Sequence, residues 1–362
     1  MLINSDSLNK QIFRIHRITG LIAGVFLLLL SFTGSLLVFS DEIDHTLNVT
    51  AFHVKPEGPR RPLNELYRTG ASAVPGNPYL YFLRLPQAPS ETVVMRAEYS
   101  ADHKIYIYLH PYTGQVLHTR SNKGYFTGAL LYLHFTLLSG VNGSIAVMII
   151  GFLIIISLLT GLHVYRKHLL KVLTFRDRIE WKHRSRRWRN LHRVVGVWAL
   201  LFNLLIVITG ILIQFKVVGA RVGKKPPSVA VNAPPDFDRA YEVARGGITD
   251  FTILGVRPPK KAGDPVVFTG NAGESRVLGE YNSSVSIDPA SDTIVKKLDF
   301  KTAPLGKKLN ASVNQLHFGN FGGVGLKIVY CLLGLTPGIM ALSGVLIWWR
   351  RKYGVMKRRS GR

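Results

Sequence analysis

Four long apolar runs dominate the pattern of hydrophobic and polar positions along the chain. They extend over residues 18–39, 145–162, 194–215 and 326–349. Each is close to the about 20 residues that an α-helix needs to cross a hydrocarbon layer of about 30 Å. Basic residues flank the runs, as is typical of membrane spans. The pattern predicts four transmembrane helices.

The first run has two possible interpretations, a span or a cleaved signal peptide. It is longer than the apolar part of a signal peptide, and no small-residue cleavage site follows Phe39. We therefore expect it to be retained as the first span.

The polar segments between the first and second runs, and between the third and fourth, have a different pattern. Each contains one short helical stretch, residues 62–74 and 236–247, the second opened by a capping Asp and closed by Gly-Gly. Alternating strand-turn-strand stretches follow at 92–120 and 252–300. We expect an α+β domain with an antiparallel sheet in each segment.

The predicted fold class is thus a membrane protein with four transmembrane α-helices in two duplicated halves. Each half carries an α+β domain, expected in the periplasm, between its two helices. The predicted segments are 1–40 (N-terminus and first span), 41–126 (first outer domain), 127–166 (interfacial helix and second span), 167–189 (basic loop), 190–216 (third span), 217–312 (second outer domain), 313–350 (interfacial segment and fourth span) and 351–362 (basic tail).

The net charge of +25 is unevenly distributed. Residues 166–189 contain ten Lys or Arg against two acids, and the tail after Trp349 contains seven against none. Residues 41–126 are balanced, with nine basic and eight acidic residues. Because basic loops stay in the cytoplasm, we expect both termini and the 166–189 loop there. The basic clusters then set topology and contact anionic membrane lipids, and no nucleic-acid partner is expected.

The two halves share landmarks in the same order, which indicates an internal duplication. His16-Arg17 precedes Thr33-Gly34 by seventeen residues, as His192-Arg193 precedes Thr209-Gly210. Before the second span of each half stands a histidine that precedes a hydroxyl-glycine pair by twenty-six residues. These landmarks are His134 with Thr160-Gly161 and His317 with Ser343-Gly344.

This arrangement resembles the PepSY-associated transmembrane proteins. In that family a hairpin of the YLDPYTGEVL type lies between membrane helices, and W-W-R-R closes the last one. Here the matching stretches are "YLHPYTGQVL" at 108–117 and "IWWRRK" at 347–352. One departure is His110, which stands where the family hairpin carries Asp, whereas the second hairpin keeps Asp288.

The resemblance covers essentially the whole chain, and compact four-span members are similar to haem-containing siderophore reductases of the FoxB-like kind. It implies PepSY-like periplasmic domains and location in the bacterial inner membrane. It also implies an enzyme of iron uptake, which reduces a ferric siderophore and releases Fe(II). The siderophore assignment depends on the resemblance alone.

Histidines near the membrane edges suggest a cofactor independently. Ionisable groups near hydrocarbon are expensive and mark functional sites, and neutral imidazole is a common axial ligand of haem iron. We expect His16 and His192 to meet at the inner face and His134 and His317 at the outer face. Each pair would hold one haem b, giving two haems and an electron path across the membrane.

Several assignments stay open at the inner face. His163 is a third histidine there, and it either replaces His16 or His192 as an iron ligand or lies beside the ligands. Arg17 and Arg193 either pair with haem propionates or act as topology anchors. The single cysteine, Cys331, excludes an intrachain disulfide and c-type haem attachment.

No sequence motif of a hydrolase, nucleotide-driven pump or flavin domain is present. The electron donor is therefore expected to be a quinol or a cytoplasmic reductase. Two alternatives remain: a haem-free PepSY-domain protein with a binding, sensory or protease-regulating role, and a permease for iron complexes.

Overall fold

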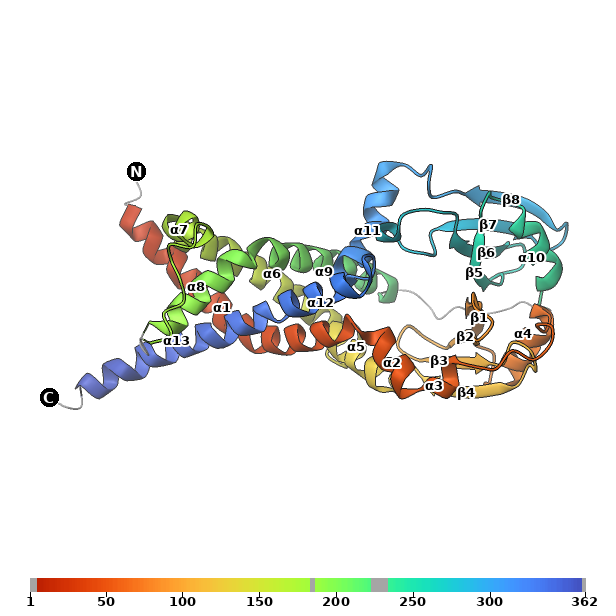
Figure 1. Ribbon diagram of the computed structural model, residues 1–362, viewed down its shortest axis with the longest axis horizontal. Helices are drawn as coiled ribbons and strands as arrows, with labels where there is room; N and C mark the ends of the chain where they lie inside the picture. Colours follow the sequence, from red (N-terminus) through yellow and green to blue (C-terminus); the bar gives the residue numbers. More distant parts are fainter. Residues whose placement is uncertain (1–4, 183–185, 223–233, 360–362) are drawn as a thin grey trace. The chain divides into compact units, whose positions relative to one another are not determined.

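The computed structural model describes residues 5–182, 186–222 and 234–359, and the chain divides into two compact units (Figure 1). The helical unit comprises Met1–Phe39, Leu130–Gly219 and Leu316–Arg362. The sheet unit comprises Ser40–Ala129 and Ala220–Gln315. The sheet unit therefore collects both polar segments that lie between apolar runs.

Six helices build most of the helical unit, and their bounds are α1 (Ser5–Leu37), α6 (Gly140–Tyr165), α8 (Arg187–Trp198), α9 (Leu200–Arg221), α12 (Gly323–Gly334) and α13 (Thr336–Arg359). Four stretches are long and apolar enough to cross a membrane: Asp6–Leu37, Gly140–Leu173, Leu200–Arg221 and Gly323–Tyr353. These coincide with the four apolar runs, so the prediction of four membrane helices is confirmed. Helix α1 packs against α6 and α13, and α8 packs against α13.

The fourth stretch is interrupted between α12 and α13. Pro337 lies at the second position of α13, where a missing N–H is tolerated at the start of a helix but not inside one. The Thr336 hydroxyl donates to the Leu333 carbonyl, and the Gly338 N–H donates to the Ser31 hydroxyl of α1. Side chains thus satisfy backbone groups at the break.

Short helices carry the outer histidines and a connection at the opposite end: α5 (Phe126–Thr136), α11 (Leu305–Phe318) and α7 (Leu169–Leu173). The link from α5 to α6 turns through left-handed conformations at Leu137 and Leu138, with φ of 47° and 59°. Between α11 and α12 the glycines Gly319 and Gly323 have φ of 73° and 69°. Both outer helices are therefore separate from the spans that follow them.

The sheet unit contains eight strands: β1 (Tyr79–Arg84), β2 (Val93–Glu98), β3 (Lys104–Leu109), β4 (Val116–Ser121), β5 (Thr252–Arg257), β6 (Val266–Asn271), β7 (Ser283–Asp288) and β8 (Thr293–Leu298). They form one antiparallel sheet in the order β4-β3-β2-β1-β5-β6-β7-β8. The two predicted α+β segments therefore share a sheet instead of forming separate ones. Strand β1, which the strand-turn-strand pattern did not predict, joins them through the pairing of Phe82 with Val256.

Helices α4 (Leu63–Ser72) and α10 (Phe237–Arg245) pack on one face of this sheet, one from each half. Leu66 and Phe237 are buried in one core with Phe82 and Phe268. The two helix starts also cap each other: Asp238 accepts from the Leu63 N–H, and Asn64 accepts from the Phe237 N–H. The halves are thus joined by backbone pairing, core packing and capping.

The two hairpins show how His110 replaces an aspartate. Its Nδ1 accepts hydrogen bonds from the backbone N–H groups of Tyr112 and Thr113. In the second hairpin, Asp288 accepts from the Ala290 N–H and the Ser291 hydroxyl. Both side chains stabilise a turn, so in this structure the departure at His110 keeps the local role.

Helices α2 (Ser40–Leu47) and α3 (Val49–Phe52) complete the sheet unit next to β4. Asp44 of α2 forms a buried ion pair with Arg120 of β4, at 2.5 Å between Oδ2 and a guanidinium nitrogen. The Arg120 guanidinium also lies 3.8 Å from the ring centroid of Tyr125. This cluster fixes the chain just after α1 and just before α5.

Candidate functional site

Two pairs of histidines lie within the helical unit. His16 of α1 faces His192 of α8 with ring centroids 6.2 Å apart. His134 of α5 faces His317 of α11 with ring centroids 6.4 Å apart. Each pair combines one residue from each half of the chain. We call them the inner pair and the outer pair, after the predicted topology.

The pairs lie at opposite ends of α1. His16 belongs to the inner pair, and Thr33 of the same helix contacts His134 of the outer pair. Seventeen residues of α-helix correspond to about 26 Å, at about 1.5 Å per residue. The two pairs are therefore separated by most of the thickness of a bilayer.

A hydroxyl group or backbone carbonyl holds the Nδ1 atom of every ring. His134 bonds to Thr33 at 2.9 Å, His192 to Ser343 at 2.9 Å and His317 to Thr209 at 3.0 Å. His16 bonds to the Ser157 carbonyl at 2.9 Å, with the Thr160 hydroxyl at 3.4 Å. The sequence landmarks Thr33-Gly34, Thr160-Gly161, Thr209-Gly210 and Ser343-Gly344 are thus the contacts of the four histidines.

These contacts fix the tautomer of each ring. The hydroxyls of Thr33, Thr209 and Ser343 donate to carbonyls of their own helices, so each accepts a hydrogen bond from the histidine N–H. The Ser157 carbonyl is an acceptor only. Each Nδ1 therefore carries the hydrogen, and each Nε2 keeps its lone pair. Among the described residues, no hydrogen bond involves any of these four Nε2 atoms.

The glycine of each landmark lets an imidazole lie against a helix backbone. A Cβ at Gly34 would be 2.8 Å from Cε1 of His134, and one at Gly161 would be 3.0 Å from Cε1 of His16. The values for Gly210 with His317 and Gly344 with His192 are 3.1 and 3.5 Å. Each of the four hydroxyl-glycine pairs therefore holds one imidazole, with the hydroxyl beside the Nδ1 atom and the glycine beneath the ring. We call each hydroxyl-glycine pair a cradle.

The spacing within each pair fits a metal held between two imidazoles. Nitrogen ligands bind first-row metals at about 2.0 Å, and a ring nitrogen is about 1.1 Å from its centroid, so two opposed rings would have centroids about 6.2 Å apart. The observed 6.2 and 6.4 Å agree with this value. Nδ1 hydrogen bonds that orient the ring are also typical of metal-binding histidines.

The outer pair is held in the neutral form. His134 and His317 lie outside the candidate spans. Burial, and second the neighbouring His317, lowers the pKa of His134 to about 4. Burial also lowers the pKa of His317 to about 4, against the opposing effect of its bond to the Ile206 carbonyl. Neutral imidazole is the form that binds a metal.

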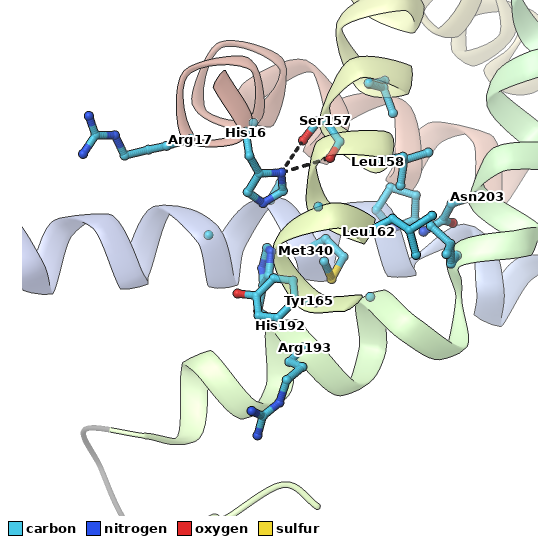
Figure 2. A pocket seen from close by; sticks show the side chains of 18 of the residues that line it. His16, Arg17, Ser157, Leu158, Leu162, Tyr165, His192, Arg193, Asn203 and Met340 are labelled. Carbon is cyan, nitrogen blue, oxygen red and sulfur yellow. Dashed lines mark hydrogen bonds between the residues drawn. The ribbon is translucent and has the colours of Figure 1, made fainter. Parts of the chain in front are cut away.

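An apolar cavity surrounds the inner pair (Figure 2). The space between its walls, including its open side, is about 1410 Å³. Its lining includes four glycines, Gly20, Gly161, Gly196 and Gly344. Because glycine has no side chain, a flat macrocycle in this cavity could approach the helix backbone closely at these positions. This geometry fits a porphyrin between His16 and His192.

The predicted arginines lie at this cavity but point away from the imidazoles (Figure 2). Arg193 pairs with Asp177 at 3.5 Å and contacts Asn190 at 3.2 Å. Arg17 is exposed and lines the cavity. Both arginines line the cavity, so their pairing with haem propionates stays a prediction. Arg193 already has an acidic partner in Asp177.

His163 is not brought into the inner pair. Its Nε2 lies 3.0 Å from the Asn9 amide oxygen, and Arg166 binds the same oxygen at 3.2 Å. The nitrogen that His163 would need for a metal is therefore occupied. Of the three inner histidines proposed as iron ligands, the structure brings together His16 and His192 and gives His163 a different partner.

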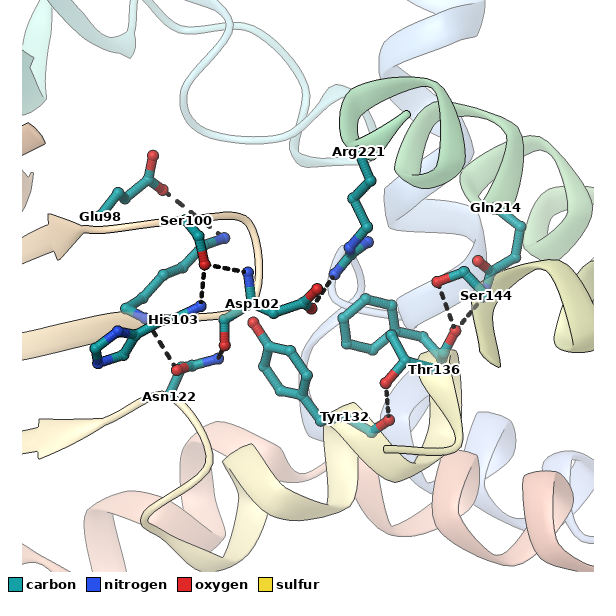
Figure 3. A network of polar contacts seen from close by, with 12 residues as sticks. Glu98, Ser100, Asp102, His103, Asn122, Tyr132, Thr136, Ser144, Gln214 and Arg221 are labelled. Atoms are coloured by element: carbon teal, nitrogen blue, oxygen red, sulfur yellow. Dashed lines mark hydrogen bonds and ion pairs between the residues drawn. The ribbon is translucent and has the colours of Figure 1, made fainter. Parts of the chain in front are cut away.

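The outer pair depends on a tight connection between α5 and α6 (Figure 3). A Cβ at Gly143 would lie 1.6 Å from the Thr136 carbonyl oxygen, so only glycine fits there. The Gln214 side chain of α9 donates to the Phe135 carbonyl at 2.8 Å. These residues set the position of His134.

Figure 3 also shows a polar network within the sheet unit. Arg221 pairs with Asp102 at 3.1 Å, and Asn122 accepts from the Lys104 N–H. This network fixes the β2–β3 turn and contains no histidine of either pair.

Among the described residues, no group of three or more His, Cys, Asp or Glu side chains converges on one point. A metal ion bound by protein side chains alone usually needs such a group. Iron in a porphyrin takes four ligands from the macrocycle and needs only two axial ones. The two histidine pairs match that second requirement.

The family model described as PepSY-associated TM region matches residues 13–351, nearly the whole chain. No curated protein matches the chain. The family match includes both histidine pairs and agrees with the resemblance indicated by the hairpin and W-W-R-R motifs.

Proposed function

The chain belongs to the PepSY-associated TM family, and we propose that it is a di-haem b oxidoreductase that passes electrons across the bacterial inner membrane. The observation that carries this proposal is the duplicated histidine pair. Two pairs, each with metal-compatible spacing and an anchored Nδ1, lie near opposite ends of one apolar helix. His16 and His192 would hold one haem, and His134 and His317 the other.

The role of the protein residues is to bind, orient and insulate. The hydroxyl and carbonyl partners at Nδ1 keep each Nε2 free and increase the basicity of the ring. The apolar walls around the inner pair exclude water and favour a flat apolar ligand. Haem supplies one-electron chemistry when bound.

We propose a ferric siderophore as the electron acceptor on the side of the sheet unit. This part rests on the likeness to haem-containing siderophore reductases. Hard oxygen chelators hold Fe(III) more tightly than Fe(II), so one-electron reduction would release the iron. The sheet unit would then be periplasmic, both termini cytoplasmic, and the donor a quinol or a cytoplasmic reductase.

The test is haem content and absorption of the purified protein, expressed with sufficient haem supply. We expect a reducible b-type spectrum and two haems per chain. His16→Ala, His192→Ala, His134→Ala and His317→Ala should each remove one haem. His118→Ala, an exposed histidine of β4, is the control and should keep both.

A colourless preparation would overturn the proposal and favour a haem-free sensory or protease-regulating protein. If haem binds, vesicles containing an enclosed reductant and an external ferric siderophore test the reaction. Fe(II) captured outside supports reductase activity, whereas iron uptake without reduction would indicate a permease. His134→Ala should abolish the external Fe(II) signal.

A further inference from the structure

A second, polar cleft lies next to the inner cavity in the helical unit. Its cations are Lys10, Arg14 and Arg17 of α1 and Arg351 of α13, and its lining also includes Asp6 and Phe13. We call it the basic cleft. It leaves about 840 Å³ of space between its walls, including its open side.

Helical periodicity gathers the α1 residues on one face. Asp6, Lys10, Phe13 and Arg17 are spaced by three or four residues, which places side chains in one row along a helix. Arg351 approaches from α13, with its guanidinium carbon 6.0 Å from the Phe13 ring centroid. The cleft thus has a basic wall from each of two helices.

The charge of the cleft is unbalanced. Four cations line it, and Asp6 is its one carboxylate. Among the ion pairs of the described residues, none includes Lys10, Arg14 or Arg17. Guanidinium groups bind phosphate through two parallel hydrogen bonds. A phosphate ester, with about −1.5 to −2 charges, complements this excess better than a single carboxylate.

The cleft is continuous with the cavity of the inner pair. Phe13, Arg17 and Arg351 line both spaces. Asn9, which also lines the cleft, binds His163 and Arg166 at the end of α6. A ligand in the cleft would therefore lie directly beside the cavity that contains His16 and His192.

We propose that the basic cleft is a binding site for the phosphate group of a ligand. The phosphate belongs either to a soluble nucleotide-like molecule or to an anionic lipid headgroup. This site is distinct from the haem ligands and does not depend on the proposed function. Within that function, a soluble phosphate-bearing reductant would approach the inner pair here.

The first experiment compares two ligands that differ only in phosphate. Flavin mononucleotide and riboflavin are titrated against the full-length protein in neutral detergent, with binding followed by equilibrium dialysis. We expect flavin mononucleotide to bind about tenfold more tightly or better, because it adds charge-assisted hydrogen bonds. Inorganic phosphate should compete with it, and chloride at equal ionic strength should compete less.

Matched variants locate the site. Lys10→Gln with Arg14→Gln removes two cations that line the cleft but not the inner cavity. Lys167→Gln with Lys171→Gln removes two exposed cations that do not line the cleft. The first variant should lose the preference for flavin mononucleotide, and the second should keep it. Haem content should be unchanged in both, which separates this test from that of the proposed function.

The second experiment tests a lipid source. The unchanged protein and the two double variants are placed in bilayer discs of phosphatidylcholine containing phosphatidylglycerol. The lipid that stays bound to the released protein is counted by native mass spectrometry. Loss of bound phosphatidylglycerol only in the cleft variant would support the lipid source. Equal binding of both flavins and equal lipid counts in all three proteins would overturn the proposal. If the double variant does not fold, Arg14→Gln alone and the phosphate competition decide the result.

Discussion

The inner and outer histidine pairs have similar distances between their rings but are carried by different structural elements. The inner pair comes from α1 and α8, both packed against α13 in the helical unit. The outer pair comes from the short helices α5 and α11, whose positions depend on left-handed turns. The hydroxyl-glycine cradle is common to both, so the ring orientation is specified in the same way at each end.

The two pairs therefore differ in what positions their rings, apart from the cradle that both have. At the inner pair, a change in one cradle acts on rings whose helices are already held by packing against α13. At the outer pair, the cradle acts together with the α5–α6 turn and its glycine at position 143. The outer pair should therefore be the more sensitive of the two to changes in backbone geometry.

The largest effect is expected for Gly143→Ala. The added methyl group would overlap the Thr136 carbonyl oxygen, at 1.6 Å, and the turn that positions His134 would have to change. In a His16→Ala background, which leaves only the outer pair, haem content should fall to near zero. In a His134→Ala background it should stay close to one per chain.

The control for this prediction is Gly219→Ala, where the methyl group meets nothing within 4 Å. It should leave haem content unchanged in both backgrounds. Equal haem loss from inner and outer sites in the Gly143→Ala protein would contradict the separation between the two supports.

A smaller effect is expected when the glycines of two cradles are compared. Gly34→Ala would bring a methyl group 2.8 Å from His134, whereas Gly344→Ala would bring one 3.5 Å from His192. Overpacking of this kind typically costs about 1–3 kcal/mol, and the second distance is an ordinary contact. The rate of haem transfer to a scavenging apoprotein should rise for Gly34→Ala and change little for Gly344→Ala. The reverse order would show that the inner cradle is the tighter one.

Removal of single hydroxyls should have a weaker and selective effect. Thr33→Val deletes the hydroxyl partner of His134 and should weaken the outer site about tenfold, as is typical for residues that orient a metal ligand. Thr160→Val should change the inner site less, because His16 keeps the Ser157 carbonyl. Haem affinity measured by titration of the haem-free proteins tests this difference. Equal losses would mean that the hydroxyl at 3.4 Å matters as much as the one at 2.9 Å.

The smallest effect is expected for His163→Ala. The Nε2 of His163 is bonded to Asn9, and this ring is absent from the inner pair. The variant should keep two haems and the same reduced spectrum as the unchanged protein. Loss of the inner haem would instead identify His163 as a ligand.

The pattern of apolar runs was sufficient to predict the spans, because a helix of about 20 apolar residues has few alternatives to crossing a membrane. Equal spacing between landmarks predicted His16, His134, His192 and His317 as site residues, and the structure brings these residues together in two pairs. It did not show why Thr33-Gly34 and its equivalents recur. Their role depends on contacts between residues far apart in sequence, such as Thr33 with His134.

The sheet was predicted less completely for a related reason. Individual strands follow from alternation of side chains, but pairing between β1 and β5 joins residues such as Phe82 and Val256 across most of the chain. No local pattern specifies such a partner. Likewise, the replacement of aspartate by His110 could be interpreted only when its hydrogen bonds to the turn were known.

Four strands from each half form the sheet, and β1 of the first half pairs antiparallel with β5 of the second half at its centre. An isolated half of the chain would leave β1 as a bare edge and each imidazole without its counterpart. Two halves related by a twofold axis could restore both the pairing of the central strands and the pairing of the imidazoles. Co-expression of the two halves as separate chains should therefore reassemble a coloured complex, with β1 and β5 paired at its interface.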